Sequence, residues 1–563
     1  MRKVFLFLFV SFYALIASAV PAKRERHILT LADGSKVEAT SMGDELLHFY
    51  KTDDGRCLQC DSLCIAHFVE SDVLYSRWKA KVEKRQAARA SRARKGVRSK
   101  EQEERRPMIG SKTGLVVLVQ FPETSFYFTD SEFQSYFNER GYSGGNNAGS
   151  VRDYFNDASY GLFDFTFDVI GPITMGQPLS YYGGNNSRGD DKYPATMVAE
   201  ALKMIDDEVD FTKYDWDNDG EVEQIFLIHA GYDEAQSGVK TDIWSHAWTL
   251  TEALEEGDGK GPITLDGVLI DRYATSSELR GKNGNYLAGI GTACHEFSHC
   301  FGLPDFYDTY LGRNFGMDAW DLMDYGCYNG NGGTPAGFTS YERMFCGWLE
   351  PIELTDPLIV PSMPPITSEP VAYILRNTGK YDEYYMLENR QKESWDGFLY
   401  GHGLLVLHVD YDREAWEQNV VNIERSHQRM TIIPADNMLY SGTLPGDPWP
   451  GTIKKTELSN SSTPAATLYN PNAEGNKLMP HAITEISESE DGQISFIFDE
   501  EALGIGGIKN EELRMKNEEF NDGTVYDLSG RKVSAEANSS FFILNSSFER
   551  GVYIVNGKKI ILQ

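Results

Sequence analysis

Two histidines and a glutamate in the middle of the chain have the spacing of a hydrolytic metal centre. His295 and His299 are four residues apart, so on a helix their imidazoles lie one turn apart on the same face and can bind one zinc ion. Glu296 then lies beside the metal, where its carboxylate can take a proton from a metal-bound water and pass it to a leaving amine. This triplet therefore predicts zinc-dependent hydrolysis of an amide bond.

The residues after the second histidine predict the end of that helix and a third metal ligand. Gly302 can adopt the left-handed conformation that ends a helix, and Leu303-Pro304 cannot continue one. The chain then turns back and brings Asp305 toward the metal, which leaves one zinc position open for water. Asp308 in the same turn, and Glu342 from a second helix, remain competing candidates for the third ligand.

The segment from Trp320 to Gly326 resembles the Met-turn that lies beneath the zinc ion in metzincins. Met323 is followed there by a tight turn. Tyr325, two residues later, is a candidate hydrogen-bond donor to the oxyanion of a tetrahedral intermediate. For both side chains the alternative is ordinary packing in the core.

An acidic loop upstream begins like a cation-binding loop. From Asp215 onward, carboxylates stand at positions 1, 3, 5 and 9 and a glycine at position 6. Phe226 stands where an EF-hand has its bidentate glutamate, so a complete EF-hand is excluded. We expect a shorter calcium loop that leads into a strand at 224–228; the alternative is an Asx-rich turn without a cation. The expected ligands are Asp215, Asp217, Asp219, Glu221 and Glu223.

The seven cysteines fall into two groups, one early in the chain and one around the histidine motif. They are Cys57, Cys60 and Cys64, and Cys294, Cys300, Cys327 and Cys346. An exported chain favours disulfides, but two cysteines six positions apart on one helix are about 9 Å apart along its axis, too far for a bridge. We therefore expect two bridges that join Cys294 and Cys300 to Cys327 and Cys346. In the early group, one thiol is left unpaired. It either binds the open position of the metal and keeps the precursor inactive, or it is a spare thiol beside a local disulfide.

The first residues have the pattern of an export signal. Arg2 and Lys3 precede an apolar run at 4–16 that is too short to span a bilayer, and Ala17-Ser18-Ala19 has the form of a signal-peptidase site. We therefore expect a secreted protein without a transmembrane anchor.

The net charge of −31 argues against nucleic acid as a partner, because phosphate binding requires clustered Lys and Arg.

A chain of 563 residues is too long for one hydrophobic core. The basic stretch at 77–106 predicts a polar helix or a disordered connector that proteases can reach. The apolar run at 114–121 predicts a strand buried on both faces, and alternating runs at 384–387 and 404–409 predict a β-rich module. The predicted segments are a signal peptide (1–19), a propeptide with its basic linker (20–107), a zinc catalytic domain (108–350), the β-rich module (351–500) and a tail (501–563).

Together these motifs resemble the M6 family of peptidases, the immune inhibitor A type. The resemblance is carried by HEFSHCFGLPDFYD at 295–308, IHAGYDEA at 228–235 and IWSH at 243–246, with VRDYF at 151–155, SYG at 159–161, LENRQ at 387–391, HVD at 408–410 and GDE at 43–45. It implies a secreted, calcium-stabilised zinc endopeptidase that is activated by propeptide removal. It also implies His295, His299 and Asp305 as zinc ligands and Glu296 as the catalytic base.

We therefore expect an α+β fold with a zincin (metzincin-like) catalytic domain, an N-terminal propeptide and a C-terminal β-rich module. The expected activity is that of a zinc metalloendopeptidase (EC 3.4.24-type) that cleaves proteins or peptides, with one catalytic Zn²⁺ and structural Ca²⁺. The alternatives are a non-catalytic secreted adhesin that binds zinc and calcium, and a zinc exopeptidase.

Residues 525–533 and 551–559 resemble C-terminal sorting segments of bacterial type IX secretion, and the alternative there is a small terminal β-domain.

Overall fold

The structure is a computed structural model that describes residues 20–44, 47–61, 64–94, 107–186 and 189–499, together with four short strands after them. The predicted signal peptide, residues 95–106 of the predicted linker and most of the tail lie outside the described residues. Contacts group residues up to 497 into one compact unit, apart from Asp356–Leu358, which group with the residues from Phe498 onward. The borders predicted at 107 and 350 therefore run through one compact unit. Among the described residues, no helix is long and apolar enough to cross a lipid bilayer.

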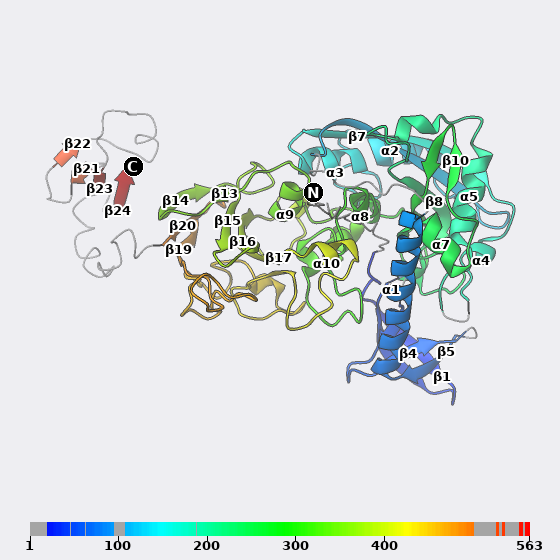
Figure 1. Cartoon of the computed structure of the whole chain (residues 1–563), viewed down its shortest axis with the longest axis horizontal. Coiled ribbons are helices and arrows are strands. Elements are labelled where there is room, and N and C mark those ends of the chain that lie inside the picture. Colours follow the sequence, from blue (N-terminus) through cyan, green and yellow to red (C-terminus); the bar gives the residue numbers. More distant parts are fainter. Residues whose placement is uncertain are drawn as a thin grey trace, which may run out of the picture. The chain divides into compact units, whose positions relative to one another are not determined.

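The predicted propeptide contains a small closed β-barrel followed by a long helix (Figure 1). The barrel strands are β1 (Arg26–Leu31), β2 (Lys36–Met42), β3 (Phe49–Lys51), β4 (Cys57–Cys60) and β5 (Ile65–Val69). Successive strands are antiparallel, and a parallel pairing of β1 with β5 closes the barrel. Helix α1 (Ser71–Arg94) shows that the described part of the basic stretch is helical.

A five-stranded sheet forms the centre of the predicted catalytic domain. Its order is β7 (Phe163–Thr174), β6 (Gly110–Gln120), β8 (Ile225–Tyr232), β12 (Arg272–Leu279) and β9 (His246–Thr249). The first four strands are parallel, and β9 is antiparallel to β12. As predicted, β6 is buried on both faces: Val116 and Leu118 belong to one hydrophobic cluster, and Leu115, Val117 and Val119 to another.

Helices cover both faces of this sheet. On one side lie α2 (Asp130–Asn138), α3 (Val151–Ala158) and α8 (Ile290–Cys300), and on the other α5 (Pro194–Met204) and α7 (Leu250–Glu256). Shorter elements are α4 (Leu179–Tyr182), α6 (Glu234–Ser237), α9 (Ser340–Phe345), α10 (Arg413–Glu417), β10 (Ile263–Leu265) and β11 (Val268–Ile270), and the 3-10 helices η1 (Gly144–Asn146), η2 (Phe211–Tyr214), η3 (Asp318–Trp320), η4 (Tyr325–Gly332), η5 (Ser394–Asp396) and η6 (Leu444–Gly446). The expected mixture of helices and strands is confirmed.

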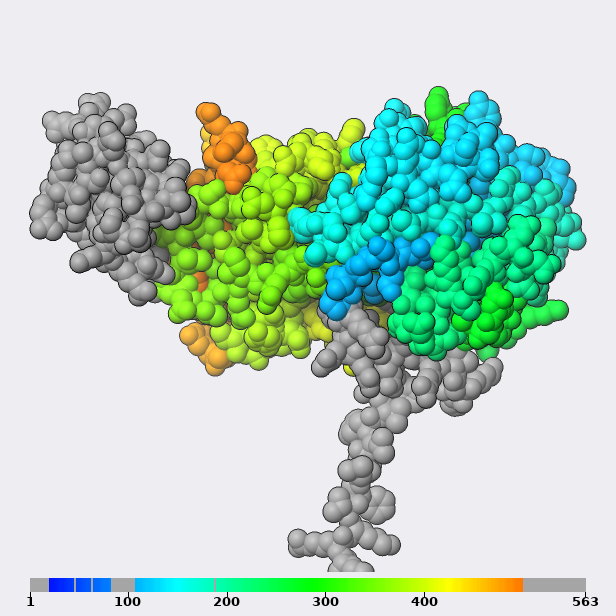
Figure 2. Space-filling model, turned by 90° about the horizontal axis from the view of Figure 1, so that it is seen from above, coloured from blue at the N-terminus to red at the C-terminus, as the bar shows by residue number. Residues whose placement is uncertain are grey.

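The segment after residue 350 is rich in strands, as predicted. One sheet has the order β13 (Ile352–Glu353), β15 (Tyr373–Asn377), β16 (Lys380–Arg390), β17 (Gly403–Asp410) and β18 (Met430–Ile432), and a second has β14 (Leu358–Met363), β20 (Ile494–Phe498) and β19 (Ile483–Glu488). The runs predicted at 384–387 and 404–409 lie within β16 and β17. In space-filling view, this module and the catalytic segment share a continuous surface (Figure 2).

The described part of the tail is a four-stranded antiparallel sheet. Its order is β22 (Lys532–Ser534), β21 (Val525–Asp527), β23 (Gly551–Val555) and β24 (Lys558–Leu562). These strands include parts of the two stretches that resemble sorting segments, and their role in sorting stays a prediction.

Candidate metal centre

Helix α8 carries both histidines of the motif through the interior of the protein. Each of its residues is buried, and its first turn lies against η4 so closely that a Cβ atom on Gly291 would be 1.9 Å from the carbonyl oxygen of Cys327. The helix ends after Cys300, where Gly302 has a φ of +94°. This left-handed residue is the predicted helix stop, and it turns the chain toward Asp305.

Three ligand atoms converge at the end of this helix. His295 Nε2 and His299 Nε2 are 3.2 Å apart, and Asp305 Oδ1 lies 3.1 Å from the first and 3.6 Å from the second. All three side chains are buried. The predicted zinc ligands are therefore brought together, close enough to share one cation.

The surroundings of the three side chains suit a metal ion. The Nδ1 atoms of His295 and His299 lie 2.9 Å and 2.8 Å from the backbone carbonyls of Leu322 and Leu303, so both Nε2 atoms face the shared point. Burial lowers the pKa of His299 to about 4, which keeps this imidazole neutral and its lone pair available at neutral pH. Asp305 Oδ1 is buried and accepts no hydrogen bond from the described residues, as expected of an atom that binds a cation.

The two competing candidates for the third ligand have other partners. Asp308 accepts backbone hydrogen bonds from the loop that follows it, including those of Tyr310 and Arg313. Glu342 forms a capping box with Thr339 at the start of α9. Neither belongs to the group of ligand atoms around the histidines in the described part of the chain.

Asp305 is held by a residue from the β-rich module that sequence reasoning did not identify. Its backbone N–H donates to Asn419 Oδ1 at 2.7 Å, and Asn419 Nδ2 donates to Asp305 Oδ2 at 2.6 Å. The backbone carbonyl of Asn419 also accepts the Thr309 hydroxyl at 2.9 Å. These bonds fix the side chain so that Oδ1 points to the histidines. A separation of 114 residues gives no local sequence signal for this contact.

Met323 lies in a turn that is connected to the ligand loop. Its carbonyl accepts the backbone N–H of Phe306, next to Asp305, at 2.8 Å, and its own N–H donates to Asp321 Oδ1 at 2.7 Å. The Met323 side chain is fully buried. The predicted Met-turn segment is therefore joined by a backbone hydrogen bond to the loop that carries the third candidate ligand.

Two buried carboxyl groups face each other below this turn. Asp321 and Glu342 are both fully buried, and each carboxyl group shifts the pKa of the other, so the two lie next to each other. Burial, and then the charge of Asp321, raise the pKa of Glu342 well above its usual value. Burial likewise raises the pKa of Asp321, to about 7, while the charge of Arg390 lowers it and that of Glu388 raises it. Glu342, a candidate ligand from sequence, thus lies in a position that supports the Met-turn segment.

The first described residues of the chain reach into this centre. The backbone N–H of Val20 donates to Glu296 Oε1 at 3.1 Å, and the Tyr328 hydroxyl donates to the carbonyl of Pro21 at 2.8 Å. Farther along, the Arg24 guanidinium lies over the ring of Tyr325, 3.8 Å from its centroid. The predicted propeptide therefore contacts both the predicted base and the predicted oxyanion donor. Burial raises the pKa of Tyr325 to about 12, and its role in catalysis stays a prediction.

Comparison with known proteins identifies the segment that carries this geometry. Residues 119–348 match the family model described as immune inhibitor A peptidase M6, catalytic domain. We call these residues the M6 segment, because they are similar to the catalytic domain of M6 peptidases. The M6 segment begins within β6 and ends after α9, so it includes α8, the Asp305 loop and the Met323 turn. The expected family resemblance is thereby confirmed.

Two curated relatives each match a little more than a third of the chain. Immune inhibitor A from Bacillus thuringiensis subsp. alesti is 28% identical over 223 residues, which are 35% of this chain and 31% of that protein. Pre-pro-metalloprotease PrtV from Vibrio cholerae serotype O1 (strain M66-2) is 29% identical over 235 residues, 37% of this chain and 25% of that protein. The chain thus spans less than a third of the length of these curated relatives.

The acidic loop of the M6 segment brings three of its five expected calcium ligands together. Oxygen atoms of Asp215, Asp217 and Glu223 lie within 4.8 Å of one another, whereas Asp219 and Glu221 are outside this group. The loop turns through backbone hydrogen bonds such as Gly220 N to Asp215 Oδ2 at 2.9 Å. The arrangement fits a hard cation, and calcium binding stays a prediction.

The cysteines of the M6 segment do not form the predicted bridges in the structure. All seven cysteines of the chain lie in described residues, and no disulfide joins them. Cys294, Cys300, Cys327 and Cys346 instead belong to one hydrophobic cluster with α8. Burial raises the pKa of Cys294 and Cys327 well above its usual value, so these two thiols act as small apolar core residues. Neither group of potential metal ligands in the described residues includes a cysteine.

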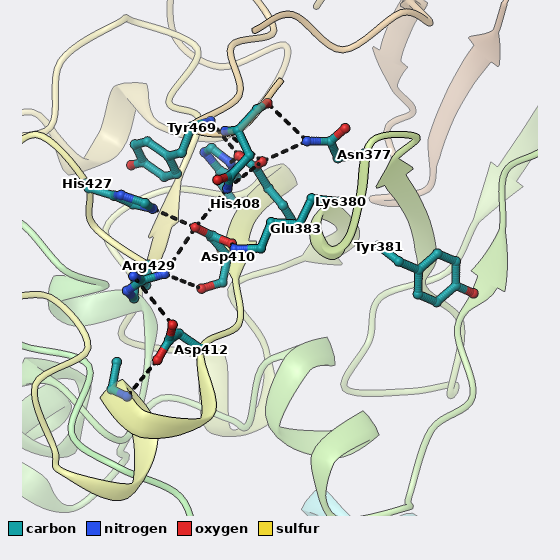
Figure 3. A network of polar contacts seen from close by, with 12 residues as sticks. Asn377, Lys380, Tyr381, Glu383, His408, Asp410, Asp412, His427, Arg429 and Tyr469 are labelled. Carbon is teal, nitrogen blue, oxygen red and sulfur yellow. Dashed lines mark hydrogen bonds and ion pairs between the residues drawn. The ribbon is translucent and has the colours of Figure 1, made fainter. Parts of the chain in front are cut away.

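A separate polar network joins strands of the β-rich module (Figure 3). Asp410 on β17 accepts a hydrogen bond from His427 Nε2 at 2.6 Å and pairs with Lys380. Glu383 on β16 lies 3.0 Å from His408 Nε2. Although burial raises the pKa of Asp410, the hydrogen bonds from His427 and Lys380 outweigh it and hold that pKa below its usual value. Because both carboxylates are satisfied by the protein, the network holds the module together.

Proposed function

We propose that this chain is a secreted zinc endopeptidase that is made as a zymogen and hydrolyses internal peptide bonds of proteins. The observation that carries the proposal is the convergence of His295 Nε2, His299 Nε2 and Asp305 Oδ1 beside Glu296. Two imidazoles and one carboxylate form a catalytic zinc ligand set that leaves a position for water or substrate. Bound there, zinc would polarise the substrate carbonyl and acidify a water molecule.

The side chains around the metal supply orientation and proton transfer. Glu296 is fully buried between the two histidines on α8. Its carboxylate takes a proton from the attacking water and returns it to the leaving amine. The backbone carbonyls at the Nδ1 atoms of His295 and His299 keep both rings oriented, so that substrate binding need not reorganise the centre. Tyr325 would donate its hydroxyl to the developing oxyanion.

A zincin-type fold of the metzincin kind is supported by the order of the parts. A parallel sheet with an antiparallel edge strand lies against the helix that carries both histidines. The chain then passes through a glycine stop, the third candidate ligand and a buried methionine turn. Calcium at Asp215, Asp217 and Glu223 would stabilise the start of β8, which lies in the middle of that sheet.

Latency is supported by the position of the segment that begins at Val20. Cleavage of a signal peptide after Ala19 would turn the Val20 nitrogen into a terminal amine, 3.1 Å from Glu296 Oε1. An amine at this carboxylate occupies the position of the amine released from a substrate. The segment therefore blocks the site as a retained product would. Activation then requires removal of the barrel, α1 and residues 20–24 by proteolysis at the basic stretch before Pro107.

Secretion is supported by the export pattern of residues 1–19, and surface sorting by residues 525–533 and 551–559. The mature enzyme would then act outside the cell on proteins or peptides. A non-catalytic adhesin is disfavoured because a purely structural zinc site has no use for Glu296 next to its ligands.

Cleavage of casein tests the proposal. The processed wild-type protein should cut casein internally, and both a chelator and Glu296→Ala should reduce the rate by at least about a thousandfold, since general base and metal are both required. Zinc content of Glu296→Ala should remain one per chain. Equal cleavage by wild type and Glu296→Ala would refute the mechanism, and trimming from the ends without internal cuts would favour the exopeptidase.

A further inference from the structure

The side chain of Arg24 lies in an acidic pocket beside the candidate metal centre. Its Nη1 donates to Asp318 Oδ2 at 2.9 Å and to Ser441 Oγ at 2.6 Å, while its guanidinium covers the ring of Tyr325. Asp318 and Tyr325 belong to the M6 segment and Ser441 to the β-rich module. An arginine from another polypeptide can make each of these contacts, and a lysine can make the ionic and cation–π ones.

This pocket carries negative charge that favours a bound cation. The Asp318 side chain is only 5% exposed, and the fully buried carboxyl of Asp324 lies close enough to Arg24 to raise its pKa. The Asp324 carboxylate accepts the backbone N–H groups of Met317, Asp318 and Tyr325, whereas Asp318 Oδ2 faces Arg24. When Arg24 leaves with the propeptide, Asp318 loses the counter-ion that it has in the intact chain. A basic side chain of a substrate would restore the pair.

The position of Val20 sets the register of such a substrate. Its nitrogen lies at Glu296, where the leaving amine receives its proton, so Val20 takes the place of the first residue after the scissile bond. Tyr328 holds the carbonyl of Pro21, the second residue. Counting along the same segment, Arg24 takes the place of the fifth residue after the scissile bond.

We propose that the mature enzyme has a subsite for arginine or lysine at the fifth position after the scissile bond, formed by Asp318, Tyr325 and Ser441. This subsite rests on the proposed function, because it requires peptide hydrolysis at Glu296. It makes basic polypeptides the preferred substrates, and it uses the same contacts that hold the propeptide segment in place.

Matched peptides test the subsite on the processed enzyme. Quenched fluorescent peptides with one cleavable bond carry Arg, Gln or Glu at the fifth position after that bond and are otherwise identical. The wild type should show the order Arg, Gln, Glu in kcat/KM, with about a tenfold advantage of Arg over Gln, the size expected of one buried charge pair. Asp318→Asn should bring the Arg-to-Gln ratio close to one. Asp412→Asn, which removes a carboxylate near Arg429 in the β-rich module, should keep the wild-type ratio.

The outcomes separate the subsite from the proposed function. Internal cleavage of all three peptides at equal rates would overturn the subsite and leave the zinc endopeptidase intact. An unchanged Arg-to-Gln ratio in Asp318→Asn would overturn it as well. A digest of denatured casein, mapped by mass spectrometry, should show Lys and Arg enriched at the fifth position, and enrichment only elsewhere would refute the register. Failure of the wild type to cut any peptide faster than Glu296→Ala would refute the proposed function itself.

Discussion

The buried pair of carboxyl groups of Asp321 and Glu342 makes stability depend on pH. Burial raises the pKa of Glu342 well above its usual value, so the folded state keeps a proton that the unfolded state gives up above about pH 4.5. The stabilisation is complete below that pH and is lost as the pH rises through the raised pKa. Glu342→Gln keeps a donor for Asp321 but cannot ionise. We therefore expect its melting temperature to fall less than that of wild type between pH 6 and 9, as thermal unfolding would measure.

The opposite result would show that the pair is not a protonated one. If Glu342→Gln lost stability in parallel with wild type over this range, the pH dependence would come from other groups. Glu424→Gln is the matched control, since Glu424 lies on the exposed surface of the module. This control should leave the pH dependence unchanged.

Asp305 and Asp308 can be told apart by their effect on metal content. Asp305→Asn removes the carboxylate whose Oδ1 faces both histidines, so we expect zinc affinity to fall by at least about tenfold, as ligand-shell changes commonly cause. Asp308→Asn changes a side chain that accepts backbone N–H groups, and it should retain stoichiometric zinc. Zinc per chain after dialysis, measured by atomic spectroscopy, would decide. Retention of zinc by Asp305→Asn and loss by Asp308→Asn would reverse the assignment.

At the scale of elements, the contact between α8 and η4 leaves no room for a side chain at Gly291. Helix propensity alone would make Gly291→Ala stabilising by about 0.5 to 1 kcal/mol. The 1.9 Å approach of the Cys327 oxygen predicts the reverse, a loss of about 1 to 3 kcal/mol, because the helix must move. Gly176→Ala is the control, since nothing lies within 4 Å of the added Cβ. Denaturant unfolding measures whether the free energy of unfolding rises or falls. A gain in stability for Gly291→Ala would contradict the observed contact.

The acidic loop should make the M6 segment depend on calcium for stability. Calcium at about 100 times its Kd would stabilise the folded state by about 2.7 kcal/mol, so added calcium should raise the melting temperature. Asp217→Asn removes one of the three grouped ligands and should shift this rise to higher calcium concentrations. Asp206→Asn, in an exposed position outside the loop, should not. If added calcium does not change the melting temperature, the loop is an Asx-rich turn without a cation.

Local signals explain which elements could be predicted from the sequence. The histidine spacing, Gly302 and the apolar run of β6 act within a few residues, and each has its expected structure. The contacts of Asn419 with Asp305 and of Val20 with Glu296 join residues 114 and 276 positions apart. Such contacts depend on the packing of whole segments and leave no periodicity to detect. The predicted disulfides are absent from the structure for a related reason: cysteine spacing does not distinguish a bridge from apolar packing in a core.

At the scale of the whole molecule, the predicted propeptide contacts the M6 segment through α1 and the barrel as well as at Glu296. Tyr75 and Trp78 of α1 each lie with their rings 4.8 Å from that of Tyr310. On the barrel, His48 packs against Trp244. Together with the bonds of Val20 and Arg24 at the site, these contacts predict that the intact chain is inactive toward casein.

Arg24→Ala tests this latency without removing the propeptide. The substitution deletes the ion pair with Asp318 and the cation over Tyr325, so we expect measurable activity before proteolysis, together with faster activation by limited trypsin. Lys36→Ala, at an exposed position at the start of β2, is the control and should remain latent. If Arg24→Ala were as inactive as wild type until trypsin is added, the contacts of Arg24 with Asp318 and Tyr325 would not contribute to latency.

The β-rich module should be required for catalysis, because Asn419 orients Asp305. Asn419→Ala removes the amide that bonds to Asp305 Oδ2 and to its backbone N–H. Loss of an outer partner of a metal ligand typically costs about 10- to 100-fold in metal affinity or activity, and we expect a loss of that size with the fold retained. Casein assays at saturating and limiting zinc would separate weaker metal binding from slower turnover. Full activity at limiting zinc would contradict the role of this amide.

The bonds between Asn419 and Asp305 also bear on how such enzymes can diversify. The part of the chain that matches the M6 family ends at residue 348, well before this asparagine. A gene rearrangement that exchanged the part after residue 348 for an unrelated one would therefore keep the histidine motif but remove the amide that orients Asp305. Lineages that acquire new downstream modules must carry a substitute for this amide, and engineered chimaeras will need one too.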